Sequence, residues 1–345
     1  MQKILVVGPS WVGDTILAQP LLRRLREQDP HAQLDVLAPA WTLPLLQRMP
    51  EVSQGIASPF AHGELKVSVR LALARELRTH RYDRAIILPN SFKSALIPWL
   101  ARIPLRTGYV GEFRYPLLND ARRLDVQALP TMAERFAALA QPKGASLSRP
   151  LPSLRLSVDP AARAQLLTQL GLDASARPVA CLCPGAEYGP AKRWPVEYFA
   201  ELARQLLSDG YQVWVIGSSK DQALGAEIAK QSGGAAIDLT GRTSLAQAVD
   251  VLSTARCVVA NDSGLMHVAA ALDIPLLALY GSSSPAFTPP LSARAQVLKL
   301  DLPCSPCYER ECPLQHFHCM RQLTPARVRQ ALMPMQSSSM NGPAR

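Results

Sequence analysis

The chain has 345 residues, of which 48% are hydrophobic, and this is enough for two domains that each have their own core. No run of about 18 or more uncharged apolar residues occurs, so the sequence predicts no membrane-spanning helix. Lys and Arg number 37 against 27 Asp and Glu, a formal net charge of +10. This charge favours an anionic partner, although a general preference for arginine would also explain it. The sequence has no lysine block and no alternation of aromatic and basic residues, so nucleic acid ranks below an anionic small or lipid-linked substrate.

The chain opens with a short apolar stretch, residues 4–7, that runs directly into Gly8. A secretory signal would need a longer apolar segment followed by a small-residue cleavage site, and neither is present. We therefore expect a buried first strand and a cytoplasmic protein.

Short β-branched runs alternate with helical patterns along the whole chain, and each run ends in a loop containing Gly, Pro, Asn or Asp. The expected strands are residues 4–7, 34–37, 85–88, 179–183, 212–216, 236–239, 257–260 and 276–279. Continuous apolar strands between helices predict α/β architecture with parallel sheets that helices cover on both faces. The helix after the first strand carries leucines at four-residue spacing, and Pro20 is expected to bend its first turns.

A proline-rich stretch near residue 150 divides the chain, and we place the linker near residues 145–178, including a helical segment at 159–170. The expected domains are 1–155, binding an acceptor, and 156–335, binding a donor. The last expected helix, 325–333, is a candidate for packing back onto the N-terminal domain, and the polar tail 336–345 is expected to be disordered. Two facing doubly wound domains would bring their ligand loops to one interdomain cleft.

The first loop reads Gly8-Pro9-Ser10-Trp11-Val12-Gly13-Asp14. A dinucleotide fingerprint would have its second glycine at Ser10, so the spacing argues against a nicotinamide enzyme. Asp14 is expected at the start of the following helix. It is interpreted either as a helix cap or as a carboxylate that takes the proton of an attacking hydroxyl, and one residue can do both.

Two loops in the second half point to a diphosphate. Lys192 and Arg193 enter a helix after a strand, where backbone N–H groups and the helix dipole assist anion binding; solvated surface charges are the alternative. Asp262, Ser263 and Gly264 open an apolar helix, an arrangement that presents free N–H groups to phosphate. Asp262 would also hold sugar hydroxyls, whereas His267 is as readily interpreted as a structural residue.

Weaker signals surround these loops. The loop 217–221, with Ser218 and Asp221, is consistent with nucleoside contacts, as is Thr243, and Glu187 lies in the Lys192 loop. In the first half, the candidates for binding an anionic acceptor are Ser10, Trp11, Ser91, Lys93, Arg106 and Arg114. Each of these, taken alone, is as well explained by a solvated surface side chain.

Four motifs in this order resemble those of the ADP-heptose:lipopolysaccharide heptosyltransferases, most closely those of the heptosyltransferase II type. They are Gly8-Pro9-Ser10-Trp11-Val12-Gly13-Asp14, Pro89-Asn90-Ser91-Phe92-Lys93-Ser94, Pro184-Gly185-Ala186-Glu187-x4-Lys192-Arg193-Trp194-Pro195 and Asn261-Asp262-Ser263-Gly264-Leu265-Met266-His267-Val268. The resemblance extends from residue 1 to about residue 333.

This resemblance implies a GT-B fold and an inverting transfer of L-glycero-D-manno-heptose from its β-linked ADP donor. The implied acceptor is the first heptose of the Kdo–lipid A inner core, giving an α-1,3 link, with contact to the cytoplasmic face of the inner membrane. A heptosyltransferase I or III with another acceptor, or a non-catalytic binding module, is the alternative. We expect a monomer, no nucleic-acid partner and no cofactor required for catalysis.

The resemblance also carries roles onto individual residues. Asp14 corresponds to the proposed base and Lys192 to the lysine that contacts donor phosphate. The Asp-x-Gly-x-x-His pattern of Asp262, Gly264 and His267 corresponds to residues that hold the donor sugar and diphosphate, with Ser263 between them.

A cysteine cluster departs from the simplest family pattern. The spacing Cys304-x2-Cys307-x4-Cys312-x6-Cys319 suits a structural zinc site, and free thiols are the alternative. The remaining cysteines, Cys181, Cys183 and Cys257, lie in apolar runs and are expected to be core thiols.

Overall fold

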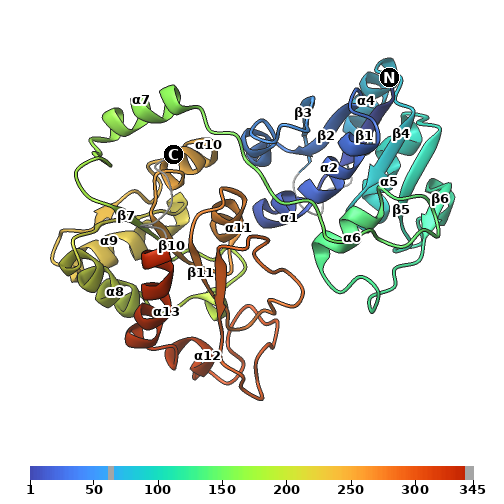
Figure 1. The fold of residues 1–345 in the computed structure, drawn as a ribbon. Coiled ribbons are helices and arrows are strands. Elements are labelled where there is room, and N and C mark those ends of the chain that lie inside the picture. Colours follow the sequence, from blue (N-terminus) through green and yellow to red (C-terminus); the bar gives the residue numbers. More distant parts are fainter. Residues whose placement is uncertain (61–65, 339–345) are drawn as a thin grey trace. The chain divides into compact units, whose positions relative to one another are not determined.

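The computed structural model describes residues 1–60 and 66–338, without the side chains of 336–338, and the chain divides into two compact units (Figure 1). The first unit is Met1–Ser153 and the second is Leu154–Arg345. Each unit contains one six-stranded parallel sheet between helices. This confirms the predicted α/β class.

The first unit is built on the strand order β3-β2-β1-β4-β5-β6. These strands are β1 (Lys3–Val7), β2 (Gln33–Pro39), β3 (Gln54–Ser58), β4 (Arg84–Ile87), β5 (Leu105–Tyr109) and β6 (Asp120–Arg122). Val6 of β1 lies opposite Val36 of β2 and Ile86 of β4, so the strand predicted first along the chain lies inside the sheet. The strands β3, β5 and β6 were not predicted, because polar residues interrupt each of them and leave no continuous apolar run.

Helices cover both faces of this sheet. They are α1 (Val12–Leu17), α2 (Gln19–Gln28), α3 (Leu43–Leu46), α4 (Val67–Thr79), α5 (Phe92–Leu100) and α6 (Met132–Ala138), with short 3-10 turns at Ala40–Thr42 and Tyr115–Leu117. Leu5 and Val7 face α4 and α5 in one hydrophobic cluster, while α2 packs beside α6. The bend expected near Pro20 is a full break, with α1 ending at Leu17 and α2 beginning at Gln19. Proline has no N–H to continue the ladder of helix hydrogen bonds.

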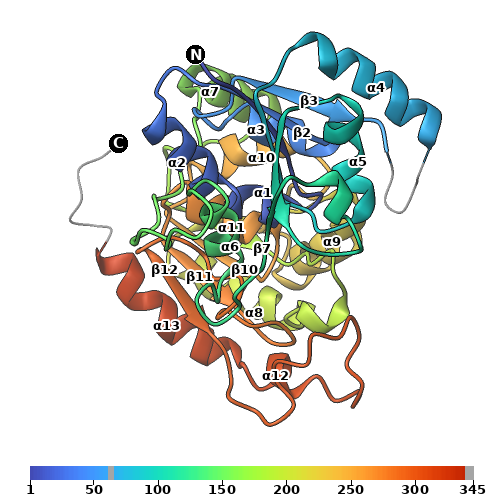
Figure 2. The ribbon, with the colours of Figure 1, turned by 90° about the vertical axis from the view of Figure 1, so that its right-hand side faces the viewer.

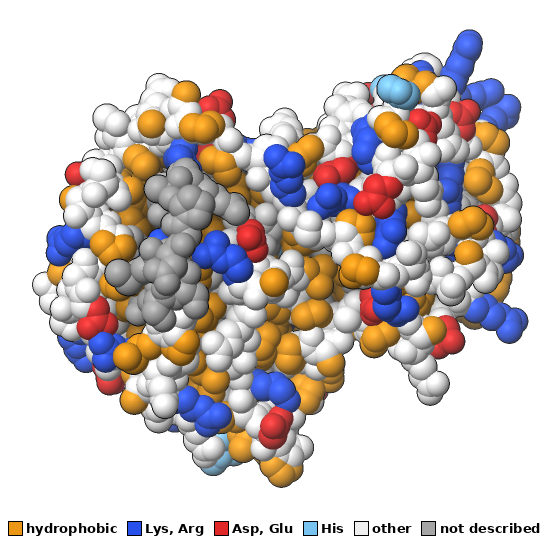
Figure 3. Space-filling model, in the orientation of Figure 1, with side chains coloured by type: hydrophobic (Ala, Val, Ile, Leu, Met, Phe, Trp, Pro, Cys, Tyr) orange, Lys and Arg blue, Asp and Glu red, His pale blue; other side chains and the backbone are white. Residues whose placement is uncertain are grey.

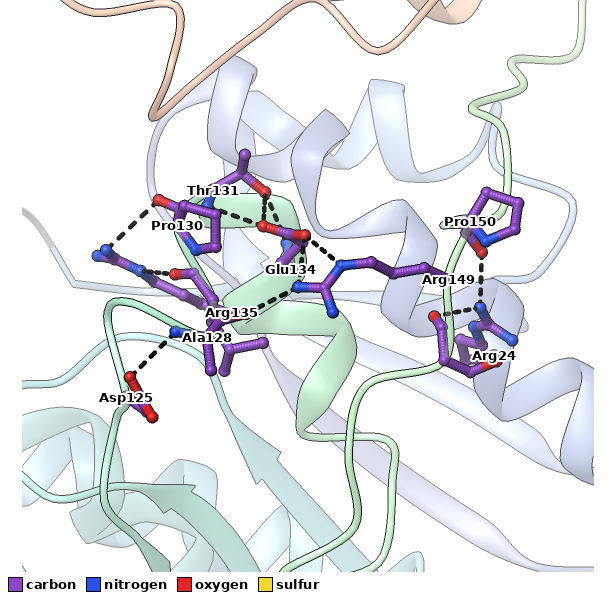
Figure 4. A network of polar contacts seen from close by, with 11 residues as sticks. Arg24, Asp125, Ala128, Pro130, Thr131, Glu134, Arg135, Arg149 and Pro150 are labelled. Atoms are coloured by element: carbon purple, nitrogen blue, oxygen red, sulfur yellow. Dashed lines mark hydrogen bonds and ion pairs between the residues drawn. The ribbon is translucent and has the colours of Figure 1, made fainter.

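A polar network holds the end of the first unit in place (Figure 4). Thr131 and Glu134 form a capping box at the start of α6, and Arg149 donates to Glu134 at 2.8 Å. Arg24 of α2 donates to the carbonyl of Pro150 at 2.8 Å. The segment that leaves the unit is therefore fixed to both α6 and α2.

The second unit has the strand order β12-β11-β10-β7-β8-β9. These strands are β7 (Val179–Cys183), β8 (Gln212–Val215), β9 (Ile237–Asp238), β10 (Cys257–Asn261), β11 (Leu276–Leu279) and β12 (Ala295–Leu298). Leu182 of β7 lies opposite Val259 of β10 and Val215 of β8. The sequence missed only β12, a strand at the edge of the sheet.

Helices surround the second sheet as well (Figure 2). They are α7 (Pro160–Leu170), α8 (Val196–Ser208), α9 (Gln222–Gln231), α10 (Leu245–Leu252), α11 (Gly264–Ala271), α12 (His318–Arg321) and α13 (Pro325–Ser338), with 3-10 turns at Pro190–Lys192 and Ser219–Asp221. Alternate strand residues face the α8 side, where Leu182 packs with Phe199 and Leu202. The intervening residues, such as Cys181, are equally buried against the other layer.

The last helix is longer than the sequence predicts and packs in the second unit. Val328 and Leu332 of α13 are buried in the hydrophobic core of the second unit beside α8, and the packing of this helix on the N-terminal domain stays a prediction. The helix also continues to Ser338, which makes the first residues of the predicted disordered tail helical. The rest of that tail, residues 339–345, lies outside the described residues.

Candidate functional site

The carboxyl ends of β7, β10 and β11 carry the polar groups from which the candidate donor site is built. In the second sheet β7 lies between β10 and β8, so the chain reverses its winding direction there. Such a switch point leaves a crevice at the carboxyl ends of the strands, because the connections depart in opposite directions. The loops that follow β7 and β10 contain Lys192 and Asp262.

Lys192 and Asp262 meet although 70 residues separate them in the chain. The Lys192 ammonium lies 2.6 Å from Oδ2 of Asp262, and the hydroxyl of Ser283 donates to the same oxygen at 2.5 Å. All three side chains are largely removed from solvent, and Asp262 is 6% exposed. The sequence did not single out Ser283, since its contact depends on the pairing of β11 with β10.

Asn261, the last residue of β10, ties the two loops together. Its side-chain oxygen accepts from the backbone N–H of Trp194 at 3.1 Å, and its amide nitrogen donates to the carbonyl of Pro184 at 2.7 Å. Asn261 is completely buried. The loop that carries Lys192 is therefore fixed at both ends to the strand that carries Asp262.

His267 lies one turn into α11 and is 3% exposed. Burial lowers the pKa of its imidazole from 6.5 to about 4; nearby Asp262 opposes this shift and Lys192 adds to it. The ring is therefore neutral at physiological pH. Its Nδ1 has no hydrogen-bond partner among the described residues, and the same is true of the buried hydroxyls of Thr243, Ser263 and Ser282. Such unpaired groups are costly in a folded protein, and a bound polar ligand would satisfy them.

Other residues predicted to bind the donor take part in the fold. Asp221 accepts from the backbone N–H and the hydroxyl of Ser218, both at 2.8 Å, in a capping box that starts the Ser219–Asp221 turn. A side chain at Gly185 would lie 2.6 Å from the Asp221 carboxylate, which would have to move out of its capping box. Glu187 pairs with Lys220 on the exposed surface. The carboxylates of Asp221 and Glu187 thus already have protein partners.

In the first unit, β1 lies between β2 and β4, and its loop and the loop after β4 flank the corresponding switch point. Asp14 is the third residue of α1 and is half-buried, while the N-cap position belongs to Trp11, which makes no side-chain capping bond. The interpretation of Asp14 as an ordinary N-cap is therefore wrong. The positive end of a helix dipole still lies beside its carboxylate.

Aromatic rings surround the first loop. Trp11 is 46% exposed, and Trp41, which the sequence analysis did not select, is 55% exposed. The indole N–H of Trp41 donates to the carbonyl of Ser10 at 3.0 Å. Exposed indoles beside a switch-point loop are suited to the face of a sugar ring.

Two of the predicted acceptor residues serve the fold instead. Arg114 is completely buried, and its guanidinium donates to the carbonyl of Tyr109 at 2.9 Å and to the side chain of Asn90 at 2.9 Å. Arg106 donates to the carbonyls of Leu117 and Ile103. A side chain enclosed by backbone carbonyls is not available to a ligand, so the prediction for Arg114 is wrong and Arg106 is largely occupied by its own loop.

The two remaining candidates lie at the start of α5. Ser91 is the N-cap residue and accepts from the backbone N–H of Ser94. Lys93, in the first turn, is half-buried. Both lie where the chain passes from β4 into α5, and their roles toward an acceptor stay predictions.

The four clustered cysteines are free and half-buried. Together with His316 they line one cavity of about 360 Å³. Within residues 1–60 and 66–338, no three Cys, His, Asp or Glu side chains are grouped closely enough to hold a metal ion as they stand. Across the same ranges, no helix is both long and apolar enough to cross a membrane.

Comparison with known proteins agrees with this geometry. The model of glycosyltransferase family 9 (heptosyltransferase) matches residues 70–318. Lipopolysaccharide heptosyltransferase 2 of Salmonella typhimurium is 49% identical over 96% of this chain and 97% of its own, and lipopolysaccharide heptosyltransferase 1 of Pseudomonas aeruginosa is 30% identical over 91% and 88%. The solved structure of Escherichia coli ADP-heptose lps heptosyltransferase II superimposes with a TM-score of 0.88 at 46% identity, covering 98% of this chain and all of the other. The fold is GT-B, and the chain belongs to glycosyltransferase family 9, the heptosyltransferases.

Proposed function

We propose that this glycosyltransferase moves L-glycero-D-manno-heptose from its β-linked ADP donor to the first heptose of the Kdo–lipid A inner core, forming an α-1,3 bond. The observation that carries the proposal is the Lys192–Asp262–Ser283 cluster at the switch point of the second unit. The name of the type 2 relative from Salmonella typhimurium, which is 49% identical to this chain against 30% for the type 1 relative, supports the choice of acceptor.

The donor would bind across the loops that follow β7 and β10. Lys192 supplies positive charge for the diphosphate, and the first backbone N–H groups of α11 have no partners within the helix. Oδ2 of Asp262 already receives two hydrogen bonds, so Oδ1 is left to accept from hydroxyls of the heptose. The unpaired hydroxyls of Ser263 and Thr243 supply further polar contacts.

The reaction needs a base on the acceptor side and stabilisation of the leaving group on the donor side. The oxygen of the acceptor hydroxyl bonds to the anomeric carbon of the donor heptose, and Asp14 takes the proton of that hydroxyl. The bond between that carbon and the β-phosphate oxygen breaks, and ADP leaves with the electron pair. Lys192 and the N-terminus of α11 offset the negative charge that develops on ADP, which is where electrostatic stabilisation contributes most.

The charge of the two units supports an acceptor role for the first. Residues 1–153 carry 20 basic against 12 acidic side chains, a net +8, whereas residues 154–345 carry 17 against 15, a net +2. On the face shown in Figure 3, Lys and Arg side chains are spread over the first unit, at the right. A positive surface favours an acceptor bearing carboxylates and phosphates, and peripheral contact with an anionic membrane face.

An acceptor-dependent assay of ADP release tests the proposal. Purified protein should release ADP from ADP-heptose when heptosyl-Kdo2–lipid A is present, and the product should gain one heptose in an α-1,3 link. Turnover only with a Kdo2–lipid A acceptor that lacks heptose, or only with the doubly heptosylated acceptor, would contradict the proposed acceptor. Either result would favour the alternative of a type 1 or type 3 heptosyltransferase. Absence of turnover with all three acceptors would overturn heptosyl transfer itself.

A further inference from the structure

A long segment without helix or strand connects β12 to α12. It spans residues 299–317 and forms the coil near α12 in Figure 1. Loops of this length without regular structure are uncommon in compact domains unless something other than secondary structure fixes them. Three of the seven cysteines lie within this segment and a fourth, Cys319, lies two residues after it. The heptosyl transfer proposed above uses none of the four.

The segment and the start of α12 bring four cysteines around one space. Cys304, Cys307, Cys312 and Cys319 all line the cavity of about 360 Å³, with His316 beside them. The other three cysteines are strand residues that are completely buried in the sheet of the second unit. The chain therefore separates core thiols from a second set that shares a partly open cavity.

The backbone around these thiols turns tightly. Tyr308, directly after Cys307, has a φ of 61°, and Gln315, three residues after Cys312, has a φ of 56°. Non-glycine residues occupy this left-handed region at a cost, so something must compensate for it. The backbone N–H of Phe317 donates to the sulfur of Cys312 at 3.4 Å, a contact that becomes stronger when the sulfur is a thiolate.

We propose that Cys304, Cys307, Cys312 and Cys319 bind one tetrahedral metal ion of the class that prefers thiolates, Zn²⁺ or Fe²⁺. Four protein sulfurs around one ion make a closed, structural site with no position left for substrate. Each thiol that is protonated before binding releases its proton to solvent as its sulfur coordinates the ion. The inference stands independently of the proposed heptosyl transfer.

The thiols surround the cavity but do not converge on one point, since no three potential ligands stand at metal-holding distance. Metal binding therefore has to draw the sulfurs inward. Binding energy of this kind commonly drives local folding in small metal sites, because the site is completed only when the ion is present. Cys304, Cys307 and Cys312 lie outside any helix or strand, whereas Cys319 belongs to α12, so the three loop sulfurs are the ones that would move toward it.

The metal would also stabilise the loops of the donor site, because the cysteine-bearing segment, residues 299–317, is hydrogen-bonded to them. The backbone N–H of Ala191, next to Lys192, donates to the carbonyl of Arg310 at 3.0 Å. The hydroxyl of Tyr188 donates to the carbonyl of Tyr308 at 2.7 Å, and the N–H of Tyr308 donates to the carbonyl of Ser282 at 2.6 Å. Metal binding by the cysteines would restrain these backbone groups. It would thereby hold the loops that carry Lys192 and Ser283 in place.

Elemental analysis of the untagged full-length protein, purified under reducing conditions without chelator, provides the test. We expect about one equivalent of metal per chain, and the element found distinguishes zinc from iron. The double variant Cys304→Ser/Cys312→Ser should lose the metal, whereas the matched control Cys257→Ala, a core thiol, should retain it. Metal retained by the double variant would overturn the assignment.

A second measurement uses only the wild-type chain, so it does not depend on whether variants fold. The metal-free protein is mixed with Zn²⁺ or Fe²⁺ under anaerobic conditions, and free thiols are counted with a chromogenic reagent after gel filtration. Binding should protect four thiols that become reactive when a strong chelator is added, and chelation should lower the melting temperature. Failure to retain either ion, or unchanged reactivity of the four thiols, would sink the proposal.

Discussion

Asp262 is held by two donors on one oxygen. Lys192 and Ser283 both reach Oδ2, at 2.6 and 2.5 Å. This arrangement fixes the plane of the carboxylate and leaves its second oxygen for substrate. Hydrogen bonds to charged groups contribute about 1.5–3 kcal/mol each, so losing one donor should be measurable without loss of the fold.

Replacing Ser283 by Ala should therefore weaken donor binding. We expect the KM for ADP-heptose to rise about tenfold, as a loss of about 1.4 kcal/mol implies, with a smaller change in kcat. Ser283→Thr should restore most of the affinity because it keeps the hydroxyl, and Ser208→Ala, at the exposed end of α8, serves as the control. An unchanged KM in Ser283→Ala would mean that Lys192 alone positions the carboxylate.

The prediction for Asp14 concerns chemistry rather than binding. Asp14→Asn keeps the shape of the side chain but removes the base, so kcat should fall by about 10²–10⁴-fold, while the KM for the donor stays within a few-fold. Glu76→Gln, an exposed acidic residue of α4, should change neither constant. Full activity in Asp14→Asn would show that another group takes the proton.

His267 makes stability depend on pH. Its pKa in the folded chain is about 4, below the unfolded value of 6.5. Between these values the unfolded chain binds a proton that the folded chain does not, so stability falls as the pH falls through this window. From pH 7 to pH 5 the cost of this group is about 2 kcal/mol. Urea unfolding of the second unit should show a shallower pH dependence in His267→Gln, and identical slopes would contradict the assignment.

At the scale of the element, Arg114 fastens the loops that follow β4 and β5. It is enclosed by acceptors from Tyr109, Asn90 and Ser94, and burial lowers the pKa of its guanidinium to about 10. A lysine at this position has one donor group in place of a planar fork and would leave several of those acceptors unpaired.

We expect Arg114→Lys to destabilise the first unit by about 3 kcal/mol, a cost typical of breaking a buried charged network. In scanning calorimetry this is a fall of roughly 6–12 °C in the transition of that unit. Arg123→Lys, an exposed control on the same unit, should leave the transition within about 2 °C. Equal melting temperatures would show that these hydrogen bonds do not stabilise the first unit.

Some elements were predictable and others were not, for a physical reason. The central strands β1, β4, β7 and β10 are covered on both faces, so they read as apolar runs in the sequence. Strands such as β6 carry polar residues because helices bury them less completely. Such strands are recognised only from their pairing with a neighbouring strand. Residues in the loops that follow predicted strands, such as Lys192 and Asp262, could therefore be chosen as candidates from the sequence, whereas Ser283 and Trp41 needed the sheet and its loops.

At the scale of the whole molecule, the two units carry different charge, +8 against +2. If the acceptor binds the first unit, its affinity should depend on salt more strongly than that of the donor. Raising NaCl from about 0.05 to 0.5 M, which shortens the screening length from about 14 to 4 Å, should raise the KM for a deacylated acceptor several-fold. The KM for ADP-heptose should change less, and an equal change in both would locate the acceptor elsewhere.

The contact between the Lys192 loop and the segment 299–317 determines which substitutions each of the two loops tolerates. A side chain at Gly189 would lie 2.3 Å from the carbonyl oxygen of Arg310, and this oxygen also accepts from Ala191. On the Arg310 side this hydrogen bond uses only the main-chain carbonyl, and the guanidinium lies separately over the ring of Tyr188, 5.3 Å from its centroid. A substitution at position 310 keeps the hydrogen bond and loses only this exposed ring contact, whereas a side chain at position 189 would clash with the main chain. In a mutational library, substitutions should therefore be depleted more strongly at position 189 than at position 310.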